Sequence, residues 1–176
     1  MNYADIKYCD VANGEGVRVS LFVSGCTHHC KECFNKEAWD FHYGEPFTQK
    51  EIDRILEYLK PNYIAGLSLL GGEPMEPVNQ EGILPLLRVV KQTYPEKNIW
   101  CYTGYLFDKD VLDKMCKESE VTKEIVSYLD IVVDGEFMID RKNLKINFRG
   151  SDNQRIIDVK KTLDAGEIVH WEREIQ

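Results

Sequence analysis

The chain of 176 residues carries 22 Lys and Arg against 30 Asp and Glu, giving a formal net charge of −8, and 43% of its residues are hydrophobic. A domain commonly has roughly 100–200 residues, so we expect residues 1–176 to form a single domain. The acidic balance argues against binding to nucleic acid or to an anionic membrane, because both attract positively charged surfaces.

The chain shows no sign of a membrane or secretory segment. No apolar run approaches the ~20 residues that a membrane-spanning helix needs. The first residues, Met-Asn-Tyr-Ala-Asp, lack the basic start and apolar stretch of a signal peptide. We therefore expect a cytoplasmic protein whose six cysteines are reduced thiols rather than disulfides.

Apolar runs and amphipathic segments alternate along the chain. Strands are predicted at residues 18–23, 63–70, 98–102 and 130–133, and helices at residues 48–60, 80–94, 110–117 and 121–129. The helix at 48–60 has the clearest signals, because Thr48 and Glu51 form a capping-box pattern and Pro61 follows its end. Short strands are also predicted at 144–148, 155–159 and 167–169, while the tail after residue 158 holds no recognisable motif.

This alternation of strands and helices predicts parallel strands joined by right-handed crossovers. The chain is too short for a complete eight-stranded barrel, which usually needs about 250 residues. Two architectures are compatible with this alternation: an open doubly wound sheet, and an incomplete TIM-type barrel with outer helices. In either architecture, ligands bind beyond the carboxyl ends of the strands. The predicted strand ends carry residues 24–33, 71–74, 103–105 and 134–135, so the candidate chemistry converges on one face.

Three cysteines follow the first predicted strand with C-x₃-C-x₂-C spacing, at Cys26, Cys30 and Cys33. Three thiolates on one short loop can surround one soft metal centre, either an iron–sulfur cluster or zinc. Structural zinc needs four ligands, commonly from two paired C-x₂-C motifs, and no second pair follows here. Three ligands suit a [4Fe–4S] cluster with one iron open to a substrate. The spacing therefore favours the cluster, with zinc as the alternative.

The remaining cysteines and the nearby histidines have simpler interpretations. Cys9, Cys101 and Cys116 are interpreted as small buried apolar residues rather than ligands, although the strand of Cys101 leads to the active face. His28 and His29 lie between the first two cysteines of the motif and are interpreted as solvated loop residues. A histidine acquires a role only where a partner sets its protonation state.

A second motif, Gly71-Gly72-Glu73-Pro74, follows the next predicted strand. Paired glycines let backbone carbonyls and amides approach a ligand closely. Together with the three cysteines and the aromatic Phe34, this motif resembles the radical S-adenosylmethionine enzymes, and more narrowly their glycyl-radical-activating branch. Further stretches carry the same resemblance, at residues 21–26, 33–36, 47–48, 99–105, 132–135 and 148–154.

The resemblance implies a radical S-adenosylmethionine fold, which is an incomplete barrel, and a specific set of ligands. Cys26, Cys30 and Cys33 would bind three irons of one [4Fe–4S] cluster, and S-adenosylmethionine would chelate the fourth. The implied cofactor-binding residues are Glu32, Cys33, Phe34, Gly71, Gly72, Glu73, Thr103 and Asp134. Backbone at 71–73 would bind the amino group, and residues 32–34 would line the adenine end. Lys145 and Arg149 are candidates for the carboxylate, and no catalytic side chain is implied because the cluster and cofactor carry the chemistry.

The implied activity is reductive cleavage of S-adenosylmethionine to a 5′-deoxyadenosyl radical, which removes a hydrogen from a glycine of another enzyme. The implied partner is the glycyl-radical subunit of an anaerobic ribonucleoside-triphosphate reductase, with an unidentified low-potential electron donor. Two alternatives stay open. One keeps the chemistry but changes the target to another glycyl-radical enzyme or a small molecule. The other is a zinc-stabilised, non-enzymatic interaction module.

Overall fold

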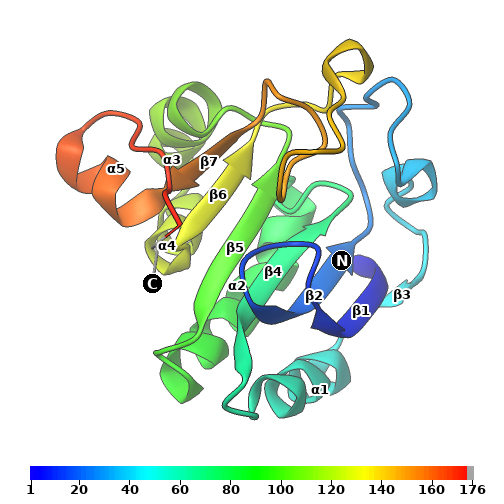
Figure 1. The fold of residues 1–176 in the computed structure, drawn as a ribbon. Helices are drawn as coiled ribbons and strands as arrows, with labels where there is room; N and C mark the ends of the chain where they lie inside the picture. The colour runs from blue at the N-terminus through cyan, green and yellow to red at the C-terminus, as the bar shows by residue number, and fades with distance from the viewer. Residues whose placement is uncertain (174–176) are drawn as a thin grey trace.

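The computed structural model describes residues 1–173 and contains one open, mixed sheet of seven strands (Figure 1). The strands lie in the order β3-β1-β2-β4-β5-β6-β7. Their bounds are β1 (Asn2–Asp10), β2 (Val17–Val23), β3 (Glu45–Pro46), β4 (Ile64–Gly71), β5 (Asn98–Thr103), β6 (Ile131–Asp134) and β7 (Arg155–Asp158). The fold is therefore of the α/β class, as predicted.

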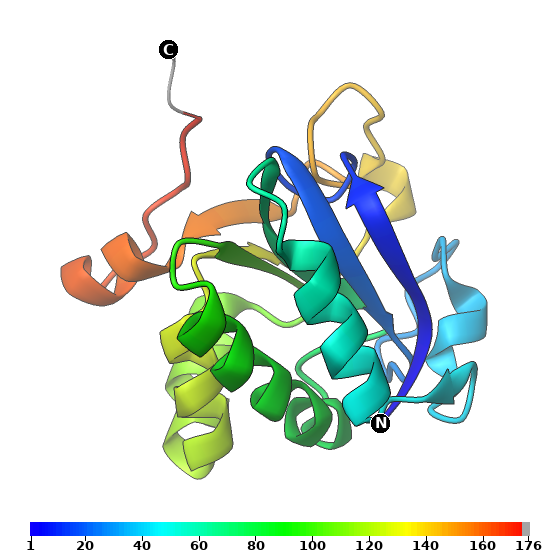
Figure 2. The same ribbon diagram turned by 90° about the horizontal axis from the view of Figure 1, so that it is seen from below.

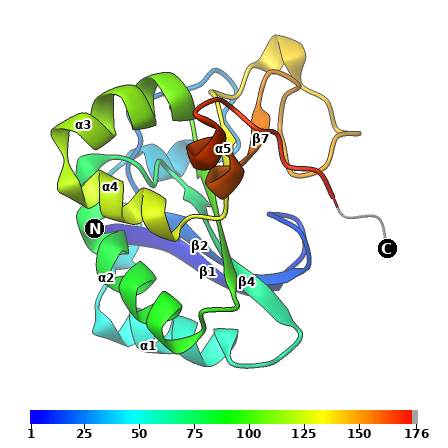
Figure 3. The same ribbon diagram turned by 90° about the vertical axis from the view of Figure 1, so that its left-hand side faces the viewer.

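The main helices cover one face of this sheet. They are α1 (Gln49–Leu59), α2 (Pro77–Thr93), α3 (Cys116–Glu118), α4 (Glu120–Tyr128) and α5 (Val159–Ala165), with the 3₁₀ turns η1 (Lys36–Trp39) and η3 (Ile139–Arg141) and the π-helical segment η2 (Phe107–Met115). Helices α1, α2 and α4 lie side by side beneath the sheet (Figures 2 and 3). Among residues 1–173, no helix has the length and apolar character to cross a bilayer.

The centre of the sheet is parallel, as predicted, because β2, β4, β5 and β6 pair with one another in parallel. The prediction of parallel strands is wrong at the edges. There β1 pairs antiparallel with β2, β3 antiparallel with β1, and β7 antiparallel with β6. A parallel crossover needs a dozen or more residues and usually a helix. The β1–β2 connection, residues 11–16, is too short for one, and no α-helix lies between β6 and β7.

The first strand, β1, was not predicted from the sequence. Its outer edge pairs with β3 only at Asn2 and Tyr3. Its pairing with β2 changes register after Tyr3 and again after Lys7, and Cys9 adopts a left-handed φ of 59°. Such irregularities bend and twist an edge strand. Most of its residues are exposed or half-buried, so the sequence lacks the apolar alternation of a strand with one buried face.

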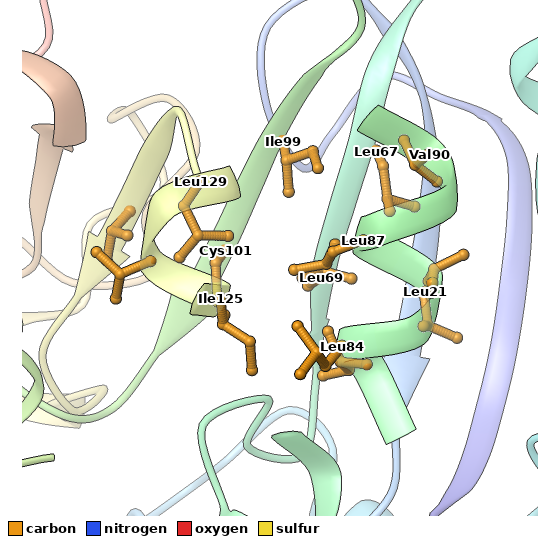
Figure 4. Close-up of a cluster of buried hydrophobic side chains, with 14 of the residues drawn as sticks. Leu21, Leu67, Leu69, Leu84, Leu87, Val90, Ile99, Cys101, Ile125 and Leu129 are labelled. Atoms are coloured by element: carbon orange, nitrogen blue, oxygen red, sulfur yellow. The ribbon is translucent and has the colours of Figure 1, made fainter. Parts of the chain in front are cut away.

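The main hydrophobic core lies between the sheet and the helices (Figure 4). The strands contribute Leu21, Leu67, Leu69, Ile99 and Cys101, and α2 contributes Leu84, Leu87 and Val90. Ile125 of α4 and Leu129, which directly follows α4, complete the labelled set. Side chains alternate between the faces of a strand, so Trp100 and Tyr102 belong to the opposite face. Cys101 is 1% exposed and packs in the helix-covered core, as predicted.

The helix predictions hold where the sequence signals were local. Helix α1 begins with the predicted capping box, in which the Thr48 N–H donates to Glu51 Oε2 at 2.7 Å. Pro85 lies inside α2 at an exposed position. The helix predicted at 110–117 is instead the π-helical η2 followed by the short α3.

Of the three short strands predicted near the end of the chain, only one forms. The segment 155–159 corresponds to β7, whereas 144–148 is a turn. No strand forms at 167–169, beside which His170 makes only an isolated bridge with Ile157. Neither segment finds a full set of backbone partners along a neighbouring strand, which a strand requires.

A wholly buried arginine, Arg18, fastens the β1–β2 connection to the sheet. Its Nε donates to Ser68 Oγ at 2.7 Å and one terminal nitrogen donates to the Glu15 carbonyl at 2.9 Å. Its other terminal nitrogen donates to two strand carbonyls, at 3.0 and 3.3 Å. Ser68 in turn donates to the Asn13 carbonyl at 2.5 Å. Burial lowers the pKa of Arg18 to about 10. These bonds hold residues 11–16 across the face that the helices leave open.

Candidate metal centre

A cavity of about 510 Å³ lies on the sheet face opposite α1, α2 and α4. Phe22, Leu70, Tyr102 and Val133, one from each parallel strand, form its floor. Their chain neighbours pack under the helices, because successive side chains of a strand point to opposite faces. The carboxyl ends of the strands supply the walls, as the sequence predicted.

The three predicted cysteines lie together on this cavity. Cys26 is buried, Cys30 and Cys33 are partly buried, and all three line the wall. Their loop turns tightly, with left-handed φ angles of 51° at His29 and 59° at Glu32. Within residues 1–173, no group of three or more His, Cys, Asp or Glu side chains is gathered closely enough to hold a single metal ion.

Burial governs the protonation of the cysteine thiols. It raises the pKa of Cys26 to about 11 and also raises the pKa of Cys30. Both groups are therefore neutral thiols at pH 7 in the metal-free chain. A metal must displace their protons on binding, because the thiolate is the ligand.

The glycine pair seats the cysteine loop, residues 24–35, on the end of β4. Gly72 donates its N–H to the Val23 carbonyl at 2.7 Å, and Glu73 donates to the Gly25 carbonyl at 2.8 Å. A Cβ on Gly72 would come within 2.5 Å of the Gly25 oxygen. Gly71 and Gly72 both line the cavity, so the glycines allow two backbone segments to meet beside the cysteines.

The carboxylate of Glu73 is almost fully buried and fully engaged by the protein. Its Oε1 accepts hydrogen bonds from Gly104 N at 2.7 Å and from Thr103 Oγ1 at 2.9 Å. The same oxygen lies 2.7 Å from His28 Nε2, and Oε2 accepts from Met75 N at 2.8 Å. This one side chain therefore joins the ends of β4 and β5 to the cysteine loop.

The structure overturns the prediction that His28 is a solvated loop residue. Its side chain is 9% exposed, and its Nδ1 lies 3.0 Å from Glu136 Oε1. Burial alone would lower the pKa of His28, but the bonds to Glu73 and Glu136 outweigh burial and raise it. The ring also packs edge-on against Tyr105. His29, by contrast, stacks on Trp39. The sequence gives no signal for His28, because its partners come from two distant segments.

Residues 32–34, predicted at the adenine end, separate into two environments. Phe34 is 65% exposed, lines the cavity and packs against Phe137 with ring centroids 5.0 Å apart. Cys33 lines the same wall. Glu32 is exposed and does not line the cavity.

The two strand-end residues also differ. Thr103 lines the cavity and bonds to Glu73. Asp134 is wholly buried outside the cavity wall, where it accepts from Phe107 N at 2.8 Å and pairs with Arg155. The structure therefore brings Thr103, but not Asp134, to the cysteines.

Three cavity residues carry polar atoms without a partner in the described part of the chain. These buried atoms are the Trp39 Nε1, the Tyr102 hydroxyl and the Arg149 Nε. Another nitrogen of Arg149 donates to the Gln154 carbonyl at 3.0 Å, which fixes the guanidinium. Buried polar atoms normally have partners, so a polar ligand in the cavity fits them well. Lys145, the other predicted carboxylate contact, does not line the cavity.

The remaining cysteines lie away from the cavity. Cys9 is exposed, so the prediction that it is buried is wrong, whereas Cys116 is partly buried and packs against the main core. The cavity therefore combines three thiols, a glycine-lined strand end and unpaired polar atoms. Soft thiol ligands beside a polar pocket fit an iron–sulfur cluster with a polar cofactor next to it.

Comparison with known proteins agrees with this donor set. A family model described as a 4Fe-4S single cluster domain matches residues 12–157. The fold and site therefore define an iron–sulfur protein with one such domain.

Curated relatives identify the family more narrowly. The chain is 43% identical over 158 residues to the anaerobic ribonucleoside-triphosphate reductase-activating protein of Enterobacteria phage T4, which covers 89% of this chain and 93% of that protein. It is 40% identical to the protein of the same name from Pasteurella multocida, over 89% of this chain and 96% of that one. It is 38% identical to the protein of the same name from Escherichia coli K12, over 88% of this chain and 96% of that protein. The chain belongs to the family of anaerobic ribonucleoside-triphosphate reductase-activating proteins.

Family membership confirms the resemblance inferred from the two motifs, and with it the prediction that the chain is an activating enzyme. The family model supports an iron–sulfur cluster as the cofactor and favours it over the zinc alternative.

Proposed function

We propose that this chain activates the glycyl-radical subunit of an anaerobic ribonucleoside-triphosphate reductase through S-adenosylmethionine. The observation that carries the proposal is the meeting of Cys26, Cys30 and Cys33 with Gly71 and Gly72 on one cavity. The names of the curated relatives support the target. When bound, a [4Fe–4S] cluster with S-adenosylmethionine supplies one electron and the 5′-deoxyadenosyl radical that takes a hydrogen from the partner's glycine.

The chain's own residues hold and orient these groups. The three cysteines would bind three irons, and backbone at 71–73 would contact the amino group of S-adenosylmethionine. Phe34, which lines the cavity, would pack against the adenine, and the unpaired atoms of Tyr102 and Arg149 would bind polar groups of the cofactor. The Glu73 carboxylate acts within the protein, because four donors already surround it. Glu32 and Asp134 stand outside this set of contacts.

The architecture suits a polypeptide substrate. We infer that the open sheet is the core of an incomplete barrel formed by the whole chain as one domain, with its helices outside and the cavity inside. A sheet that does not close leaves a side from which a glycine-bearing loop can enter. An external low-potential donor supplies the electron, and the reduced thiols that the site requires fit the cytoplasm.

Anaerobic reconstitution tests this function. The wild-type chain should bind about four irons and four sulfides. With S-adenosylmethionine, a reductant and the reductase, it should produce a glycyl radical detectable by electron paramagnetic resonance. Cys26→Ala, Cys30→Ala and Cys33→Ala should each abolish the radical. Cys9→Ser, at an exposed cysteine outside the cavity, should not.

Two results would overturn parts of the proposal. A colourless protein that holds one zinc and no sulfide would exclude the radical chemistry. A radical that forms only with a different glycyl-radical enzyme would exclude the reductase as the target.

A further inference from the structure

The stretch between the first two cysteines is held by side chains rather than by its own backbone. The Thr27 N–H and hydroxyl both donate to Glu76 Oε1, at 3.1 and 2.5 Å. His28 Nε2 lies 2.7 Å from Glu73 Oε1. Glu73 and Glu76 both belong to the Gly-Gly-Glu-Pro-Met-Glu segment after β4. Glu73 of the second motif and the nearby Glu76 therefore hold the stretch between the first two cysteines in place.

His28 differs from Thr27 because it reaches a second, distant segment. Its Nδ1 lies 3.0 Å from Glu136 Oε1, just after β6. The backbone carbonyl of Glu136 accepts from Asn153 Nδ2 at 2.9 Å, which ties that segment to the loop before β7. One imidazole thus spans from the end of β4 to the loop after β6. An imidazole can do so because its two nitrogens lie on opposite sides of a rigid ring.

The surroundings of the ring leave it little freedom. A Cβ on Gly104 would come within 2.7 Å of the His28 ring, so the β5 end packs directly against it. Tyr105 covers the ring edge-on, with centroids 4.4 Å apart. The neighbouring His29 has a left-handed φ, a conformation that a free loop does not maintain without external contacts.

We propose that His28 is the positioning residue of the cysteine loop: by bridging Glu73 and Glu136, it sets the placement of Cys26 and Cys30 for cluster binding. The identity of the bound group rests on the function proposed above. The restraint on the loop is a property of the metal-free chain and can be measured without the cluster. Side chains that orient metal ligands in this way typically contribute about 10–100-fold to metal affinity.

The test compares two histidines of the same loop. His28→Asn cannot span both carboxylates, whereas His29→Asn removes only the stack on Trp39 and tolerates the left-handed φ. In the metal-free full-length chain, hydrogen exchange at residues 26–30 should be about 10-fold faster in His28→Asn than in wild type. Exchange in α1 should not change in either variant, and His29→Asn should match wild type throughout.

The reconstituted proteins give a second measurement. A chelator should remove iron from His28→Asn about 10–100-fold faster than from wild type or His29→Asn. The spectrum of the reduced cluster should also shift in His28→Asn, which a general loss of stability would not cause. Glu136→Gln changes a half-exposed side chain without loss of volume and should give a smaller shift in the same direction.

Equal exchange and equal iron loss in His28→Asn and wild type would overturn the proposal. Equal effects in His28→Asn and His29→Asn would do so as well, because the bridge would then have no special role. If the wild-type chain holds no iron and sulfide, the proposed function fails, while hydrogen exchange in the metal-free chain still decides the role of His28.

Discussion

Replacing Gly72 with alanine should push the cysteine loop off the end of β4. The added Cβ would lie 2.5 Å from the Gly25 oxygen and 2.9 Å from the Ala38 oxygen, both backbone atoms with little freedom to move. To reach an ordinary contact of 3.4 Å, the Gly25 carbonyl must move by about 0.9 Å. Overpacking of this kind costs about 1–3 kcal/mol.

The expected consequences are a lower melting temperature and a poorly formed site. For a chain of this length, each kcal/mol lowers Tm by about 2–4 °C, so a cost of about 1–3 kcal/mol corresponds to a loss of about 2–12 °C for Gly72→Ala. Functional sites tolerate displacements of only about 0.5 Å, so iron content after reconstitution should also fall sharply. Thermal unfolding of the metal-free chain and iron analysis measure the two effects separately.

Gly82→Ala is the matched control. It lies in α2, and the atoms nearest its new Cβ belong to the side chain of the first residue, Met1, whose Cβ at 2.7 Å must shift. Alanine is a better helix former than glycine by about 1 kcal/mol, which offsets this shift, so the loss of stability should be smaller than in Gly72→Ala. Wild-type melting and iron content in Gly72→Ala would refute the argument that the glycine is needed for close backbone contact.

Three further outcomes follow from buried groups. Burial alone would raise the pKa of Asp130, but the bond from Lys91 and other donors hold it below its ordinary 3.8. The stability from this carboxylate is therefore complete above about pH 4 and is lost as pH falls through the lower folded-state pKa. Asp130→Asn should flatten this acid limb in urea unfolding, and an unchanged limb would contradict the assignment. Arg18→Leu removes four hydrogen bonds of a buried side chain, one to the Ser68 oxygen and three to backbone carbonyls, so urea unfolding should show a loss above about 3 kcal/mol; a loss under about 1 kcal/mol would refute that. In the folded, metal-free chain, an alkylating reagent at about pH 8 should label exposed Cys9 but not Cys101, whose pKa burial raises well above its ordinary range; mass spectrometry distinguishes them, and similar rates would be inconsistent with the fold.

The parts of the fold that the sequence predicted correctly are those with local signals. Helix α1 has its capping box and apolar stripe within a dozen residues, and the parallel strands are short apolar runs followed by glycine. β1 escaped prediction because its pairing with β2 depends on a tertiary partner and its exposed edge needs no apolar pattern. The π-helical turns of η2 likewise follow from packing, since their sequence has the same periodicity as an ordinary helix.

In the candidate site, too, the features with local sequence signals were predicted and those that depend on distant residues were not. The spacing of Cys26, Cys30 and Cys33 lies within one loop, and so it could be interpreted directly. The environment of His28 depends on Glu73 and Glu136, which are 45 and 108 residues away in sequence. For Asp134 the local signal misled the prediction. Its position at a strand end suggested a contact with the cofactor, but its carboxylate accepts a hydrogen bond from Arg155.

The outer edge of β1 bears on self-association. Beyond Tyr3, this edge has no strand partner in residues 1–173, and an unpaired edge can recruit a strand from another copy of the chain. Two register shifts and the left-handed Cys9 break the regular spacing of its hydrogen-bonding groups, while Asp5 and Lys7 place charges along it. The irregularity of β1 thus protects the chain against edge-to-edge aggregation. Straightening it by design would stabilise the strand and expose the protein to that hazard.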